Sequence, residues 1–186
     1  MIPTVNTCVE LMEKYDMLIN IRLHSIVVAK VSHLIANSLR QGGIDISVET
    51  VVAGALLHDI GKTISLDTSN DHAKIGSEIC RENNFHELTE IVAEHVVLKD
   101  YSIDGDYSEK EIVYYSDKRV NHDQIVSLDE REDYILERYG RNTEELRSRI
   151  KANFLLCRKV ENKLFKKLDF NAEALPRLAL NEDIGL

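Results

Sequence analysis

The sequence is poor in proline, with Pro3 and Pro176 the only two among its 186 residues. Because proline is the strongest helix breaker, nearly the whole chain is free to form helices. The sequence also lacks an internal repeat, a low-complexity tract and a clear strand pattern. Apolar residues instead recur three and four positions apart, which predicts an all-α protein.

Cysteine and long apolar runs are scarce as well. Cys8, Cys80 and Cys157 form an odd, scattered set without CxxC spacing, which favours reduced thiols over a disulfide scaffold or a zinc knuckle. No stretch approaches the ~20 apolar residues of a membrane span, and the first residues lack a signal-peptide pattern. We therefore expect a cytoplasmic protein without a membrane partner.

Positive charge is in short supply. The chain has 23 Lys and Arg against 32 Asp and Glu, a formal net charge of −9, and a pI near 5.3. A long nucleic-acid groove needs a dense basic surface, so we expect no long nucleic acid as a partner. A small phosphorylated ligand remains compatible, since a bound cation can supply positive charge locally.

The apolar spacing predicts helices over 20–40, 48–59, 71–83, 87–98, 109–120, 130–140 and 143–168, with loops at 63–70 and 99–107. Start signals support several of them: Ser47, either Asn70 or Asp71, and the capping boxes Ser108/Glu111 and Ser127/Glu130. We expect a helical domain over residues 1–125. Residues 126–186 are expected to form a C-terminal helical extension that packs on the core or on a second subunit of a homodimer.

The segment GALLHDIGKT, residues 54–63, ends in Gly-Lys-Thr as a phosphate-binding P-loop does. A P-loop also needs a glycine five positions before this one, with four residues between the two, in a loop that follows a strand. That position is Leu56, and the preceding residues have a helical pattern. The P-loop interpretation therefore fails, and the pair His58-Asp59 needs another explanation.

Several ionisable side chains lie on the apolar faces of the predicted helices. They are His24, His58, Asp59, His72, His95 and Asp117. A single one would most often be a core residue with a hydrogen-bond partner. Six converging groups are costly to bury unless they neutralise one another or bind a cation. Imidazole with carboxylate favours iron, manganese or zinc, with magnesium also admissible, and six ligands exceed one tetrahedral zinc site.

The ordered set of His24 in RLHSIVV, His58-Asp59 in LLHDIGK and Asp117 in YSDKRV resembles the HD superfamily of metal-dependent phosphohydrolases. The stretch HDIGK is similar to its HDIG subset. His72 in DHAKIGSEI and His95 in AEHVV resemble the branch that holds two metal ions. That branch includes cyclic-dinucleotide phosphodiesterases and dinucleoside tetraphosphate hydrolases, and this chain lacks the Gly-Tyr-Pro motif of the cyclic-di-GMP enzymes.

The resemblance implies an all-α HD-domain bundle that binds one or two divalent ions per chain. His24, His58, Asp59 and Asp117 would hold the first ion, and Asp59 would bridge to a second ion completed by His72 and His95. The implied reaction is hydrolysis of a nucleotide or other small phosphate ester by a metal-activated hydroxide. Lys62 is a candidate phosphate contact, against the alternative of a solvated loop lysine.

The sequence leaves the roles of several other residues, and two alternative functions, open. His122 is a candidate outer ligand or substrate contact, whereas His33 and His86 are expected at the surface. Arg22, Lys118 and Arg119 can face either way, and substrate specificity is expected in loops 63–71 and 99–108. The alternatives to phosphate hydrolysis are an HD-type di-iron oxygenase and a non-catalytic binding module with structural metals.

Overall fold

The computed structural model describes residues 1–66, 68, 70–140 and 143–186. The described helices are α1 (Val5–Lys14), α2 (Ile19–Gln41), α3 (Val48–Leu57), α4 (Lys62–Ser65), α5 (His72–Glu82), α6 (Thr89–Glu94), α7 (Glu109–Lys118), α8 (Leu128–Tyr139), α9 (Glu144–Phe165) and α10 (Leu175–Ala179), with 3₁₀ turns at His86–Leu88 and Ala172–Ala174. The all-α prediction is confirmed.

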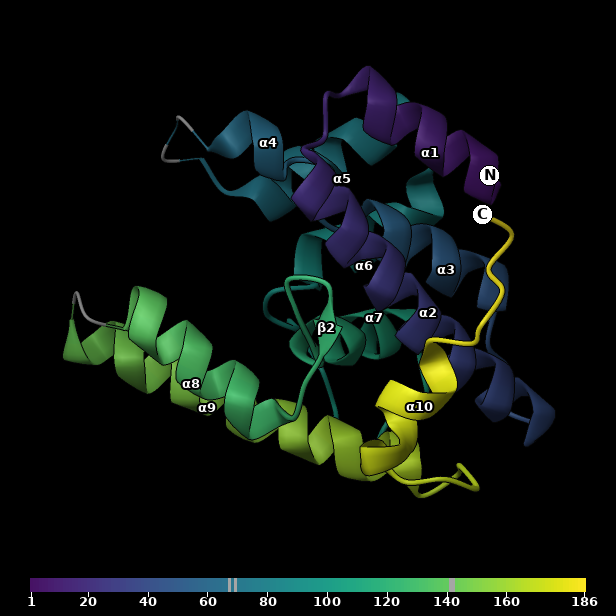
Figure 1. The fold of residues 1–186 in the computed structure, drawn as a ribbon, viewed down its shortest axis with the longest axis vertical. Helices are drawn as coiled ribbons and strands as arrows, with labels where there is room; N and C mark the ends of the chain where they lie inside the picture. The colour runs from purple at the N-terminus through teal and green to yellow at the C-terminus, as the bar shows by residue number, and fades with distance from the viewer. Residues whose placement is uncertain (67, 69, 141–142) are drawn as a thin grey trace.

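The core is a bundle centred on α2, which packs against α3 and α7, while α3 also packs against α1. α5 and α6 pair with each other, and α6 also packs on α7. Figure 1 shows α8 and α9 side by side as a helical arm that reaches away from the bundle, and α10 lies on α2. The arm and the bundle are joined through α7 and α9, whose buried residues include Phe154, Cys157 and Leu164.

Most predicted caps are present. Ser47 accepts a hydrogen bond from the Thr50 N–H, and Asp71, not Asn70, caps α5. Both capping boxes form, at Ser108 and at Ser127. Each cap satisfies backbone N–H groups that the first turn of a helix leaves without partners, which explains why these helices begin where the sequence indicates.

Three local predictions are wrong. The helix expected over 87–98 consists of a 3₁₀ turn followed by α6, which ends at Glu94 so that His95 lies at the helix end. Part of the loop expected at 63–70 is helical in α4, and residues 67 and 69 lie outside the described part. The helix expected over 109–120 ends at Lys118, and a short antiparallel hairpin, Val120–Asn121 (β1) with Gln124–Ile125 (β2), follows it. Its two-residue turn holds His122 at φ 55°, a left-handed conformation that alternating apolar patterns do not predict.

The expectation that no stretch is apolar enough to span a membrane overlooked α2. By length and composition alone this helix qualifies, although half of its most apolar window is buried inside the protein. A buried core helix passes the same test. Val28, Val31 and Ile35 are fully buried in the bundle core, which accounts for its apolar character.

Candidate metal centre

The six predicted ligands come together from five helices, and all of them except the fully buried His58 line one cleft. His24 lies in α2, His58 and Asp59 directly follow α3, and His72 begins α5. His95 follows α6, and Asp117 lies in the last turn of α7. All are buried except His72, which is partly exposed at the rim. Their roles as ligands remain a prediction, but the structure places all six within reach of one another.

The first group of possible ligands is His24, His58 and Asp59, which can together surround one ion. Asp59 Oδ2 lies 3.4 Å from His58 Nε2 and 3.9 Å from His24 Nε2. Asp117 adds a fourth donor, because its Oδ1 lies 3.0 Å from His24 Nε2 and 3.6 Å from His58 Nε2. Two imidazoles and two carboxylates therefore face the same point.

The second group is Asp59, His72 and His95. Asp59 Oδ1, the other oxygen of the same carboxylate, lies 3.4 Å from His72 Nε2 and 3.5 Å from His95 Nε2. The two imidazole nitrogens are 3.2 Å apart. Asp59 thus directs one oxygen to each group, which is the arrangement that a bridging carboxylate requires.

Backbone carbonyls orient three of the imidazoles. The Nδ1–H of His58 donates to the Ala55 carbonyl at 2.7 Å, that of His95 to Val92 at 2.7 Å, and that of His24 to His122 at 2.8 Å. Because Nδ1 carries the proton in the neutral form of each ring, the lone pair of that form is on Nε2, which faces the centre. Metal-binding histidines typically have such a partner on the other ring nitrogen, which sets both tautomer and orientation.

Two buried polar atoms at the centre have no hydrogen-bond partner among the described residues. They are His58 Nε2 and Asp59 Oδ1, one in each group of donors. Leaving a buried donor or acceptor unsatisfied costs about 1–3 kcal/mol. Divalent cations between these donors would satisfy both atoms, so the residues present fit the metal that the sequence predicts.

The electrostatics of the centre also favour a cation. Burial alone would lower the pKa of His58, but the adjacent carboxylates of Asp59 and Asp117 outweigh it and raise that pKa to about 9. Although burial opposes it, His58 helps to hold the carboxyl pKa of Asp59 well below its usual range. Lys118, together with His58, does the same for the carboxyl pKa of Asp117. Burial, with its histidine neighbours, lowers the pKa of His72 to about 4. The carboxylates are thus charged, and His72 is neutral at neutral pH.

Metal uptake at pH 7.5 is expected to release about one proton per chain, from His58. Without metal, the His58 pKa of about 9 lies above this pH, so the ring is protonated and must lose a proton to bind an ion. His72 is already neutral at its pKa of about 4 and releases none. Calorimetry in two buffers of different ionisation enthalpy measures the release. Affinity should rise with pH up to about 9, and a pH-independent affinity between 6 and 9 would contradict this assignment.

Two glycines let α5 pack closely on its neighbours, Gly61 at the segment after α3 and Gly76 at α6. A Cβ on Gly61 would lie 2.4 Å from the His72 carbonyl oxygen and 2.7 Å from the Gly76 nitrogen. A Cβ on Gly76 would lie 2.8 Å from a methyl group of Val92 in α6. Only glycine permits these approaches. The glycine of HDIG therefore has a structural role here: it lets the helix that begins with His72 reach Asp59.

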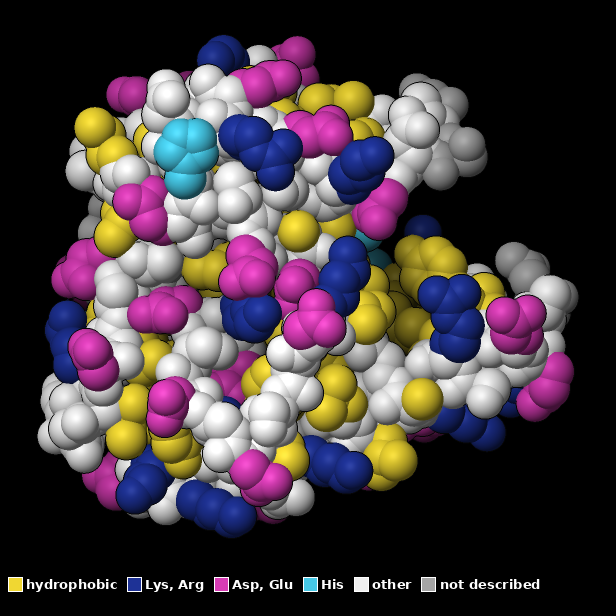
Figure 2. Space-filling model, turned by 180° about the vertical axis from the view of Figure 1, so that it is seen from behind, with side chains coloured by type: hydrophobic (Ala, Val, Ile, Leu, Met, Phe, Trp, Pro, Cys, Tyr) yellow, Lys and Arg dark blue, Asp and Glu magenta, His cyan; other side chains and the backbone are white. Residues whose placement is uncertain are grey.

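The cleft above the donors has a volume of about 720 Å³. It lies between α4 and α5 on one side and the arm formed by α8 and α9 on the other, and Figure 2 shows it from behind with histidine atoms at its base.

Lys62 lines the cleft and pairs with Asp59 Oδ2 at 2.7 Å, so this lysine is more than a solvated loop residue. That contact raises the Lys62 pKa, although burial opposes it.

The remaining candidates divide between the cleft and other parts of the molecule. The His122 ring lines the cleft and packs edge-on against Tyr134, while its backbone carbonyl holds His24. Lys118 is buried at the cleft, where it donates to the His95 carbonyl and to Asp117. Arg119 instead pairs with Glu161.

Arg22, which the sequence left open, donates to the carbonyls of Met12 and Met17 and does not line the cleft. The two histidines expected at the surface have different outcomes. His86 is exposed as predicted, whereas His33 is partly buried and pairs with Glu182 of the C-terminal segment. That correction arises because the chain end folds back onto α2, which the local sequence around His33 does not reveal.

The sequence matches the HD domain family over residues 22–151. The chain belongs to the HD domain family. This membership and the cluster of possible ligands indicate a metal-dependent hydrolase. The HDIG subset remains a prediction, as does the domain boundary expected at residue 125.

Individual relatives cover parts of the chain. Ribonuclease Y of Mycoplasma mycoides is 45% identical over 65 residues, 35% of this chain and 14% of its own length. Ribonuclease Y of Thermosipho melanesiensis is 40% identical over 73 residues, 39% of this chain and 13% of the relative. The uncharacterized protein MJ0778 of Methanocaldococcus jannaschii is 29% identical over 136 residues, 66% of this chain and 79% of the relative. The chain thus spans a small fraction of the ribonuclease Y proteins. No solved structure matches.

The arm is a part of the site that the sequence does not predict. Of the described cleft-lining residues, none comes from loop 99–108, and Ser65 and Leu66 come from the segment 63–71. The opposite side consists of α8 and α9, including Arg131, Tyr134 and Arg149. One signal was available: α8 combines arginines and tyrosines at helical spacing, but a local pattern does not say which surface that face opposes.

Proposed function

We propose that this chain is a metal-dependent phosphohydrolase that cleaves a nucleotide or another small phosphate ester. The observation that carries the proposal is Asp59, whose two buried carboxylate oxygens each face a separate pair of histidines at the base of an open cleft. Divalent ions bound there would activate a water molecule and polarise phosphoryl oxygens. The relatives named ribonuclease Y support phosphate-ester chemistry in this family.

The chain's own residues have separate roles in this proposal. His24, His58 and Asp117 would hold one ion, His72 and His95 would hold the other, and Asp59 would contribute one carboxylate oxygen to each group. Lys62, at the cleft edge with a side chain 39% exposed, leaves Asp59 to meet a phosphate oxygen as a point charge. Lys118 keeps Asp117 ionised and anchors the segment that carries His95.

The substrate is expected to be small. The acidic net charge of −9 opposes the binding of a long nucleic acid. The cleft volume of about 720 Å³ matches that of small-molecule sites, which are typically ~300–1,000 Å³.

Phosphate release from a panel of esters tests the proposal. We expect hydrolysis of at least one nucleotide by protein loaded with manganese, iron or zinc, and loss of that activity after chelation. Restored activity on adding metal back separates metal loss from unfolding. Iron-dependent dioxygen consumption without phosphate release from any ester would contradict the proposal and favour oxygenase chemistry.

A further inference from the structure

The charge of the cleft is opposite to that of the chain. Its described lining contains the cations Lys62, Lys118, Arg131, Arg138 and Arg149, against the carboxylates of Asp59 and Asp117 alone. The whole protein has 32 acidic and 23 basic residues, so positive charge is concentrated here. Both carboxylates are predicted metal ligands and are thus already neutralised when metal is bound. The cleft therefore presents more positive charge than one phosphate at the metal centre would balance.

The three arginines come from the arm, across the cleft from the metal centre: Arg131 and Arg138 in α8, and Arg149 in α9. Together they form an arginine wall. None has an ion-pair partner among the described residues. Outside the cleft, by contrast, Arg147 pairs with Glu144 and Arg158 with Asp129 on the same two helices. The arm thus neutralises arginines elsewhere and leaves those of the cleft unpaired.

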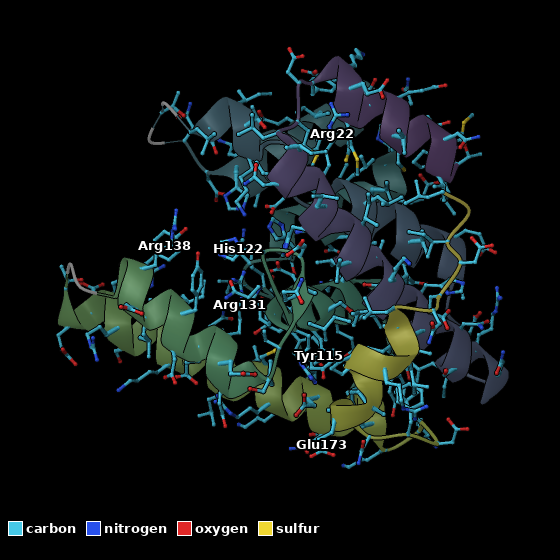
Figure 3. All side chains as sticks on the ribbon, viewed as in Figure 1. Arg22, Tyr115, His122, Arg131, Arg138 and Glu173 are labelled. Carbon is cyan, nitrogen blue, oxygen red and sulfur yellow. The ribbon has the colours of Figure 1, made fainter. Side chains whose placement is uncertain are left out.

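Neutral groups orient two members of the arginine wall without cancelling their charge. Arg131 donates through one terminal nitrogen to Asn121 Oδ1 at 2.9 Å, and its buried Nε has no partner among the described residues. Arg138 contacts the hydroxyl groups of Tyr139 and Tyr134 at 3.1 Å and 3.3 Å. Figure 3 shows Arg131 beside His122 and Arg138 directed from α8 into the space toward α4. Guanidinium groups held in this way suit bidentate contact with phosphate.

The same wall carries an accessible aromatic ring. Tyr139 is 48% exposed, lines the cleft, and lies with its ring centroid 5.6 Å from the Arg138 guanidinium. The Tyr134 ring is less available for stacking with a ligand, since His122 and Arg131 already flank it. Exposed aromatic rings next to arginine are typical surfaces for stacking a nucleobase.

We propose that the arginine wall binds a phosphate group beyond the one at the metal centre, so that the substrate is a nucleotide with at least two phosphates, its base on Tyr139. This inference rests on the proposed function and assigns its substrate class. The metal centre receives the phosphate that is cleaved, while Arg138 and Arg149 hold the next phosphate from the opposite side. A mononucleotide reaches only one of these two sites at a time.

Binding of two nonhydrolysable probes to the metal-loaded full chain tests this directly by calorimetry. Adenosine α,β-methylene diphosphate is expected to bind at least about tenfold more tightly than adenosine 5′-monophosphonate, since charge-assisted hydrogen bonds to the second phosphate are available only to the former. Arg138→Gln and Arg149→Gln should each weaken the diphosphate analogue about tenfold and leave the monophosphonate within about twofold. Arg147→Gln, two residues from Arg149 but paired with Glu144, is the matched control.

Each outcome separates this inference from the proposed function. Equal affinities for the two probes, or equal weakening of both by Arg138→Gln and Arg149→Gln, would overturn the second phosphate site even if metal-dependent hydrolysis is found. Displacement of the diphosphate analogue by a lower concentration of a single-stranded RNA oligonucleotide would also overturn it, in favour of an extended ligand. Absence of hydrolysis alongside the expected probe affinities would contradict the proposed function and leave the phosphate site standing. Tyr139→Ala should weaken the adenosine analogue more than methylenediphosphonate, because the Tyr139 hydroxyl also orients Arg138, and equal effects on the two would remove the base from the assignment.

Discussion

Asp59→Asn is expected to remove both metal ions and to lower hydrolysis by at least about a thousandfold, since metal ions contribute several kcal/mol of transition-state stabilisation. The physical reason is the shared carboxylate: Oδ2 faces His24 and His58, and Oδ1 faces His72 and His95. An amide offers one neutral oxygen in place of two charged ones. Elemental mass spectrometry measures the metal per chain, and phosphate release measures turnover.

The helical content of the Asp59→Asn variant should stay that of the wild type. Lys62 loses its partner but is 39% exposed, so its ammonium group can turn to water. His58 keeps Asp117 at 3.6 Å. His72→Ala provides a graded comparison, because it removes a ligand from the second group alone and should leave one ion bound. Asp45→Asn, at an exposed aspartate outside the cleft, controls for the loss of a negative charge.

Retained turnover in the Asp59→Asn variant, with two ions per chain, would contradict the bridging role. Equal metal content in the Asp59→Asn and His72→Ala variants would contradict the division into two groups. One ion per wild-type chain would reduce His72 and His95 to pocket residues. These outcomes are distinct because metal content and turnover are measured separately.

The convergence of the six candidate ligands could be predicted from the sequence, because local apolar spacing indicates which side chains face the core. His24 shares a helix face with Val28 and Val31, which are fully buried, and Asp117 follows Val113 at a spacing of four. Apolar periodicity alone therefore predicts that these polar groups lie inside the protein. The chain order of the six residues then carries the family resemblance, and HD-domain membership confirms that part of the prediction.

The shape of the cleft could not be predicted, since it depends on contacts between distant segments. The hairpin that brings the His122 carbonyl to His24 joins residues 98 positions apart. The arginine wall faces the centre because α9 packs on α7, a tertiary contact with no local signature. The apolar spacing predicts His95 in a helix interior, but it lies just beyond the end of α6, where its Nδ1–H meets the Val92 carbonyl.

A second large effect is expected in stability, from an ion pair outside the predicted ligand set. Lys163→Met should lower the free energy of unfolding by about 3–5 kcal/mol, the usual result of breaking a buried ion pair from one side. Lys163 Nζ lies 2.9 Å from Glu111 Oε2, and the two side chains are 9% and 0% exposed. Lys163 also donates to the Asp106 carbonyl at 3.0 Å, and the Tyr101 hydroxyl donates to Glu111. The pair thus fastens α9 to α7 and closes loop 99–108 over both.

Thermal unfolding of the metal-free protein measures this effect, and a midpoint lower by roughly 10 °C is expected for a domain of this size. Lys159→Met, an exposed lysine on the same helix, should change the midpoint little. Adding Glu111→Gln to Lys163→Met should recover part of the loss, because the neutral amide no longer leaves a buried charge unpaired and still accepts the Ser108 N–H. Equal midpoints for the two lysine variants would contradict the role of the pair. The pair thus joins the helix that carries Asp117 to the helix that carries Arg149.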